Sequence, residues 1–145
     1  MSFSKKYLQE CVETCNTINP DEIEDMANLI NSVRSESGRI FFLGVGGGAG
    51  HASHAVNDFR KICNIESYAP TDNVSELTAR VNDDGWDTCY VNWLKGSKIS
   101  NKDLIFVFSV GGGNLEKNIS VNILKSLQLA KEVGSKICGV VGRDG

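Results

Sequence analysis

The chain has 145 residues, of which 41% are hydrophobic and 23% are charged, and this composition predicts one folded domain. The formal net charge of -3 leaves no excess of basic residues, so we expect no direct contact with nucleic acid. No apolar run approaches the length of a membrane span and no signal peptide is recognisable, which predicts a cytoplasmic protein without membrane contact.

The N-terminal 37 residues predict two helices. Apolar residues recur at intervals of three and four between Tyr7 and Ile18, and Asn19 followed by Pro20 is a typical start of a second helix. We expect Gly38 to end this second helix. The apolar stripe of the first helix suits either its own core or an interface between subunits.

Beyond residue 38, apolar runs and helical patterns alternate. Strands are predicted at residues 40–43, 65–69, 104–108 and 137–141. Helices are predicted at 49–62, on either side of a turn at 82–85, and from Asn114 to Gly134 with Leu115 and Ile119 facing inward. This order predicts an α/β fold, namely a doubly wound, mainly parallel sheet with helices on both faces, preceded by the N-terminal helices.

We expect residues 1–145 to form a single domain, with a helical segment at 1–37 and an α/β core at 38–145. The last predicted strand has no helix after it, which would leave one face of the sheet partly uncovered. We therefore expect the chain to lack the C-terminal portion of its domain. The five cysteines have no CxxC spacing, which predicts reduced thiols rather than disulfides.

Two of the predicted strands run directly into glycine-rich loops. The first loop is GVGGGAG at residues 44–50, and the second is SVGGGN at residues 109–114. Ligands of doubly wound sheets bind outside the carboxyl ends of the strands, where backbone without side chains lets an anion reach exposed amides. The loops therefore predict an anion site, although tight turns alone would also explain the glycines.

Nucleotide sites are less consistent with these loops. No Gly-Lys-Ser/Thr follows either loop, which argues against a P-loop. The first loop fits the dinucleotide pattern GxGxxA, and Glu66 lies about 20 residues further on, as that pattern requires. A dinucleotide site, however, gives no role to the second loop.

Two ionisable side chains follow the first loop on the predicted helix. His54 and Asp58 are four residues apart, so they lie on one helical face, where they can form a hydrogen bond or share a metal. A metal site needs at least one further ligand, and spacing alone favours a surface interaction. We expect His51 to be a first-turn helix residue rather than a ligand.

These motifs resemble the sugar isomerase (SIS) domain family, and within it the phosphoheptose isomerases, which interconvert sedoheptulose 7-phosphate and an aldoheptose 7-phosphate. The resemblance covers essentially the whole chain and is carried by GVGGGAGHASHAVND at 44–58, TDNVSELTARVNDDGW at 71–86, FSVGGGN at 108–114 and VVGRDG at 140–145. It implies a small phosphorylated sugar as ligand, a homotetramer, and aldose–ketose isomerisation through an enediol in heptose supply for a surface polysaccharide.

The resemblance also implies roles for individual residues. Zinc would be held by His54 and Asp58, and Asp58 would be the catalytic base. The family's other zinc ligands, a glutamine and a histidine, lie beyond the end of this chain, so the zinc site is incomplete. The implied substrate-binding residues are Val45, Gly46, Gly47, Gly48, Asn82, Asp83, Ser109, Val110, Gly111, Gly112 and Asn114.

Several residues depart from the family pattern. Val110, Gly111 and Asn114 occupy positions where hydroxyl side chains usually bind phosphate, and Gly48 replaces a further serine. Asp58 is also one methylene shorter than the family's glutamate. We predict an isomerase whose residues 1–145 alone are not expected to complete the active site. The alternative is a non-catalytic SIS protein that binds phosphosugars or another protein.

Overall fold

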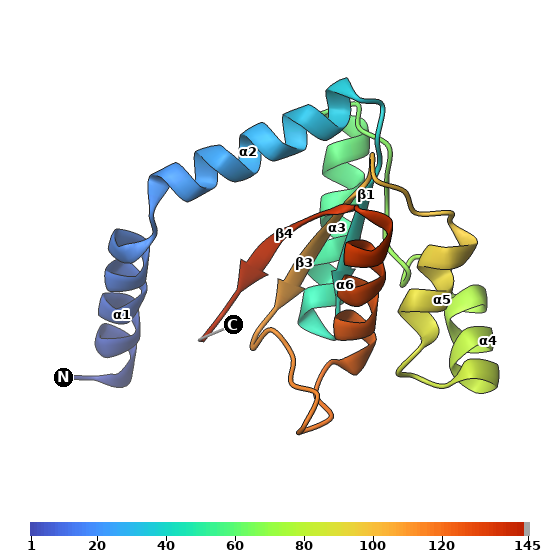
Figure 1. Cartoon of the computed structure of the whole chain (residues 1–145). Coiled ribbons are helices and arrows are strands. Elements are labelled where there is room, and N and C mark those ends of the chain that lie inside the picture. Colours follow the sequence, from blue (N-terminus) through green and yellow to red (C-terminus); the bar gives the residue numbers. More distant parts are fainter. Residues whose placement is uncertain (144–145) are drawn as a thin grey trace. The chain divides into compact units, whose positions relative to one another are not determined.

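The computed structural model describes residues 1–143. Its elements are α1 (Phe3–Thr17), α2 (Pro20–Ser35), β1 (Ile40–Gly44), α3 (Gly47–Lys61), β2 (Ser67–Tyr68), α4 (Val74–Asp84), α5 (Cys89–Gly96), β3 (Leu104–Ser109), α6 (Val121–Val133) and β4 (Lys136–Val141) (Figure 1). Contacts divide the chain into two units, Met1–Asn31 and the chain from Ser32 onward. Among the described residues, no helix is long and apolar enough to cross a lipid bilayer.

The first unit consists of α1 and most of α2. Asn19 caps α2 as predicted, because its side-chain oxygen accepts a 3.0 Å hydrogen bond from the amide of Asp21. The apolar residues of α1 form no core, since no residue of this helix is buried. Tyr7, for example, is 58% exposed and Leu8 is 63% exposed. The predicted stripe is therefore a surface feature of this chain.

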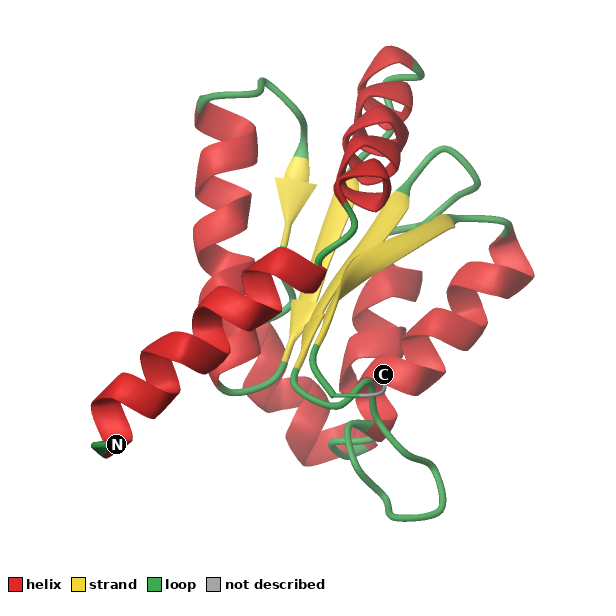
Figure 2. Ribbon diagram, turned by 90° about the vertical axis from the view of Figure 1, so that its left-hand side faces the viewer, coloured by secondary structure: helices red, strands yellow, loops and turns green. Residues whose placement is uncertain are grey.

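The second unit contains a parallel sheet. Its four strands lie in the order β2-β1-β3-β4, and each neighbouring pair is parallel (Figure 2). Right-handed crossovers place α3, which joins β1 to β2, on one face, and the helices between β2 and β4 on the other. The predicted α/β fold is confirmed. The chain winds in opposite directions from β1 and from β3, so their carboxyl ends form the switch point at which such sheets bind ligands.

The core of this unit explains the apolar strand sequences. Phe41 of β1 packs edge-on against Trp93 of α5, with ring centroids 5.5 Å apart. The next residue, Phe42, points to the other face and lies 5.1 Å from the ring of Phe59 in α3. Because both faces of β1 are covered, the strand reads as a continuous apolar run rather than an alternating one.

An ion pair ties the amino ends of β1 and β3 together. Arg39 donates hydrogen bonds to the Asp103 carboxylate from its backbone amide, Nε and Nη2, at 2.9, 3.1 and 2.8 Å. The amide of Ser100 adds another at 2.8 Å. Burial by itself would raise the pKa of Asp103, but the hydrogen bonds from Arg39 and Ser100 outweigh it and hold the pKa below its ordinary value. Asp103 is therefore a buried, fully charged anchor at the sheet end opposite the glycine loops.

The second unit begins with the last residues of α2. This helix ends just before Gly38, as predicted, but Gly38 is not the residue with the left-handed backbone that usually ends a helix. The residue in the left-handed conformation is Ser37, with a φ of 55°, rather than Gly38. The amide of Gly38 donates to the carbonyl of Val33 at 2.9 Å, as in a Schellman cap. Gly38 is needed because a Cβ there would overlap the backbone carbonyl of Lys102.

Two predicted boundaries are wrong. Helix α6 begins at Val121, not at Asn114, whose side-chain oxygen instead accepts a 2.8 Å hydrogen bond from the amide of Lys117 within a turn. Leu115 is 67% exposed and Ile119 is 51% exposed, so neither faces the core. The turn predicted at 82–85 also begins later, because α4 continues to Asp84.

Candidate functional site

The first glycine loop is a tight turn between β1 and α3. Gly46 has a φ of 58°, in the left-handed region that glycine adopts at low cost. A side chain on Gly44 would overlap the backbone of Gly48, and a Cβ on Gly48 would lie 2.5 Å from the carbonyl oxygen of Phe108. These glycines therefore let the start of α3 lie directly against the ends of both strands.

Tyr90 of α5 holds this loop from the core side. Its hydroxyl donates a 2.8 Å hydrogen bond to the carbonyl oxygen of Gly44. Burial, and to a smaller extent the neighbouring Cys89, raises the pKa of Tyr90 to about 12. The phenol therefore stays protonated, and remains a donor to the loop, throughout the physiological pH range.

The second glycine loop leaves β3 and turns back on itself. Gly112 and Gly113 have φ values of 69° and 100°. The hydroxyl oxygen of Ser109 accepts a 3.0 Å hydrogen bond from the amide of Gly112. Further on, Asn114 and Ile119 exchange two backbone hydrogen bonds of 2.9 and 2.8 Å, which close the base of an excursion between them. The loop is thus braced by its own hydrogen bonds rather than by a following helix.

Both loops line one cleft. β1 and β3 are paired with Gly44 opposite Phe108, so the two loops that follow these strands leave the sheet side by side. The cleft has a volume of about 780 Å³ and is bordered by the two loops, by the first turns of α3 and by the chain after β4. It lies at the switch point of the sheet and has the size of a small-molecule site.

The backbone provides this cleft with hydrogen-bond donors suited to an anion. Within residues 1–143, no acceptor takes the amide hydrogens of Gly47 or Gly111, which both line the cleft. Helix α3 begins at Gly47, so the positive end of its dipole also lies at the cleft. Unused amides beside a helix amino terminus are a typical environment for phosphate.

The structure brings most of the expected loop residues together. Those that line the cleft are Val45, Gly47, Gly48, Ser109, Val110, Gly111 and Asn114. Gly46 and Gly112 belong to the same loops without lining the cleft. Asn82 and Asp83 lie outside it, in the last turn of α4, where the Asn82 amide donates a 2.8 Å hydrogen bond to the Asp83 carboxylate.

Two side chains with positive or ionisable groups line the cleft without having been expected there. His51 lies in α3 with its ring centroid 5.8 Å from that of Phe108. Arg143 lies just beyond β4. Arg143 reaches the cleft because β4 pairs with β3. The sequence predicts each strand separately and does not show which strands pair.

His54 and Asp58 form the expected pair on α3. The distance between His54 Nε2 and Asp58 Oδ2 is 3.3 Å, and the two side chains are 78% and 43% exposed. Neither lines the cleft. No group of three or more potential metal ligands occurs in the described part of the chain. Zinc in proteins is held by at least three side chains, so residues 1–143 do not by themselves fit this metal.

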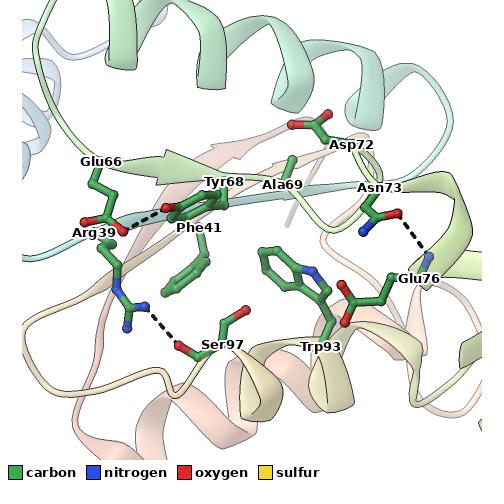
Figure 3. A pocket seen from close by; sticks show the side chains of 10 residues that line it. All are labelled: Arg39, Phe41, Glu66, Tyr68, Ala69, Asp72, Asn73, Glu76, Trp93 and Ser97. Carbon is green, nitrogen blue, oxygen red and sulfur yellow. Dashed lines mark hydrogen bonds between the residues drawn. The ribbon is translucent and has the colours of Figure 1, made fainter.

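A second cavity of about 400 Å³ lies along β2 and α5 (Figure 3). Its charged side chains are already paired. The guanidinium of Arg39 donates to the carbonyl of Ser97 at 2.9 Å as well as to Asp103, and Glu66 accepts from the Tyr68 hydroxyl at 2.9 Å. The remaining carboxylates of the cavity, Asp72 and Glu76, accept hydrogen bonds from Ser53 and Arg80. Because its charged side chains already have hydrogen-bond partners within the chain, this cavity is a weaker candidate for a ligand site than the glycine-loop cleft.

Curated proteins with similar sequences carry the name phosphoheptose isomerase. The chain is 30% identical over 146 residues to the phosphoheptose isomerase of Chlorobaculum parvum, and this match covers 96% of this chain and 66% of that protein. It is 29% identical over 146 residues to a probable phosphoheptose isomerase of Thermoplasma volcanium, which covers 96% of this chain and 70% of that protein. The chain is therefore similar to phosphoheptose isomerases over nearly its whole length.

Other comparisons extend this result. The fold matches that of a phosphoheptose isomerase from Francisella tularensis with a TM-score of 0.83 and 22% identity, over 100% of this chain and 77% of that one. The lincomycin biosynthesis protein LmbN of Streptomyces lincolnensis is 29% identical over 136 residues, 87% of this chain and 48% of that protein. The chain thus spans between 48% and 70% of the length of these three curated relatives. No protein-family model matches it.

Proposed function

We propose that the glycine-loop cleft binds a small phosphorylated sugar, and that the protein is an aldose–ketose isomerase of the sedoheptulose 7-phosphate type. One observation carries this proposal. Two glycine turns meet at the switch point of the sheet, and their unused amides lie in one cleft with the start of α3. The phosphoheptose isomerase names of the relatives supply the sugar class.

The proposed chemistry is proton transfer between adjacent carbons through an enediol, with Asp58 as the base. Asp58 is seven residues after His51 on α3, so both lie on the same face of the helix, about 10 Å apart along its axis. A sugar chain that extends from the cleft past His51 would follow this face toward Asp58. The 43% exposure of Asp58 leaves its carboxylate open to such a substrate.

The physiological setting is part of the same proposal. We place the enzyme in the cytoplasm, in the supply of heptose for a surface polysaccharide, and in a homotetramer. The exposed apolar stripe of α1 supports assembly, because a helix with no buried residue gains stability by packing against another chain.

A non-catalytic phosphosugar-binding regulator is the second candidate. It is favoured by the second glycine loop, which lacks most of the hydroxyls that usually bind phosphate in the family, and by Asp58, which is one methylene shorter than the family's glutamate. The same cleft would then bind a sugar phosphate without turning it over.

Incubating the purified natural protein with sedoheptulose 7-phosphate, with and without added zinc, tests the proposal. We expect an aldoheptose 7-phosphate to form, detectable by NMR through its anomeric proton. Saturable binding without product would favour the regulator. Absence of both binding and product would refute the phosphosugar proposal in either form.

A further inference from the structure

Arg143 is held at the cleft by the end of β4. Ser109 pairs with Val141, and the amide of Gly142 donates a 3.0 Å hydrogen bond to the carbonyl of Ser109. A Cβ on Gly142 would lie only 2.8 Å from the carbonyl oxygen of Val110. The chain that carries Arg143 is therefore fixed directly beside the second glycine loop.

The backbone of Arg143 is unusual for a residue with a side chain. Its φ is 55°, in the left-handed region, which is unfavourable for a residue other than glycine. Such conformations cluster at functional sites. No carboxylate among residues 1–143 forms an ion pair with its guanidinium, and the residue is exposed. A charged group is thus kept at the cleft without an ion-pair partner among residues 1–143.

The cleft needs such a group if it holds a phosphate. Among the described residues that line it, Arg143 is the only side chain that is always cationic, and His51 is the only other one that can become so. In the second loop, the Ser109 hydroxyl oxygen already accepts the amide of Gly112. Backbone amides supply only partial charges, whereas a phosphate ester carries nearly two negative charges.

We infer that Arg143 is a phosphate-binding residue of the cleft and supplies the full positive charge that the two glycine loops lack. This inference rests on the proposed function, since it assigns the phosphate of the same ligand. A guanidinium donates two parallel hydrogen bonds to a phosphate, which gives both affinity and orientation. Arg143 would then orient the sugar chain as well as hold it.

Calorimetry with sedoheptulose 7-phosphate and, separately, with inorganic phosphate tests this role. We expect Arg143→Gly to weaken the binding of both probes by about 10- to 100-fold, and Arg143→Lys to fall between, since lysine offers a point charge without the fork. Thermal stability of Arg143→Gly should be unchanged or higher, because glycine relieves the left-handed backbone.

Lys98→Gly is the matched control. Lys98 is also an exposed basic residue with a φ of 52°, but it does not line the cleft, so its replacement should leave binding unchanged. Sedoheptulose 7-phosphate binding that is equal in the natural protein and Arg143→Gly would overturn the inference while leaving the phosphosugar site intact. Arg143-dependent phosphate binding by a protein that does not bind the sugar phosphate would support the inference and refute the proposed substrate. Binding of neither probe would refute both.

Discussion

Replacing Asp103 with alanine is expected to lower the free energy of unfolding by about 3–5 kcal/mol. The carboxylate is 2% exposed and accepts hydrogen bonds from the backbone and guanidinium of Arg39 and from Ser100. Its removal leaves the guanidinium of Arg39, which is only partly exposed, without its counter-charge at the start of β1. Equilibrium unfolding in urea at neutral pH measures the loss.

Glu36→Ala provides the control for this prediction. Glu36 forms a 2.8 Å ion pair with Lys136, but its side chain is 49% exposed, so its loss should cost less than about 1 kcal/mol. Similar small effects for both variants would show that the Arg39–Asp103 pair does not anchor the sheet.

The same pair makes a prediction about pH. The folded-state pKa of Asp103 lies below its ordinary value of 3.8, so the contribution of this carboxylate is complete above that pH. It is lost as the pH falls further, through the folded-state pKa. The stability difference between the natural protein and Asp103→Ala should therefore be constant near neutrality and shrink in acid below about pH 4.

Replacing Gly48 with alanine is expected to destabilise the protein by about 1–3 kcal/mol and to weaken sugar phosphate binding. The new Cβ would lie 2.5 Å from the carbonyl oxygen of Phe108, a backbone atom that the ladder between β1 and β3 holds in place. The first turn of α3 must then move away from β3, which separates the two glycine loops. Urea unfolding and calorimetry with sedoheptulose 7-phosphate measure the two effects.

Gly50→Ala is the matched control, because it makes the same change two residues further along α3. No atom lies within 4 Å of a Cβ at Gly50, and the residue does not line the cleft. Alanine is preferred over glycine within a helix by about 1 kcal/mol, so this variant should be at least as stable as the natural protein and bind normally. A Gly48→Ala variant that binds as well as Gly50→Ala would show that close contact between the loops is unnecessary.

The sheet could be predicted from the sequence because its strands are buried on both faces. Residues 40–43 and 104–108 are continuous apolar runs, and each ends at a glycine loop, so their positions and the α/β fold followed directly. Strand β2 was the least accurate, since only Ser67 and Tyr68 pair with β1 out of the predicted 65–69.

The start of α6 could not be predicted because two local signals agreed on the wrong position. Asn114 is a good helix cap, and Leu115 and Ile119 have helical spacing. The chain instead forms a turn after Asn114, and Ser120 adopts a left-handed φ of 50° immediately before the helix. Whether such a segment forms a turn or a helix depends on tertiary contacts that a local pattern does not encode.

Only part of the candidate site could be predicted from the sequence. The two glycine loops were recognisable because parallel strands place their carboxyl ends at one edge of the sheet. The positions of His51 and Arg143 depend on the strand order and on the register between Ser109 and Val141, which only the structure provides. The roles expected for Asn82, Asp83, His54 and Asp58 stay predictions.

The central claim is that the two glycine loops together hold the phosphate of a sugar. A crystal structure of the natural protein soaked with sedoheptulose 7-phosphate measures this most directly. We expect the phosphate group between the loops, with its oxygens about 2.7–3.2 Å from backbone amides of both. A phosphate bound elsewhere, for example in the cavity along β2 and α5, or a cleft that stays empty at saturating sugar phosphate, would contradict the claim.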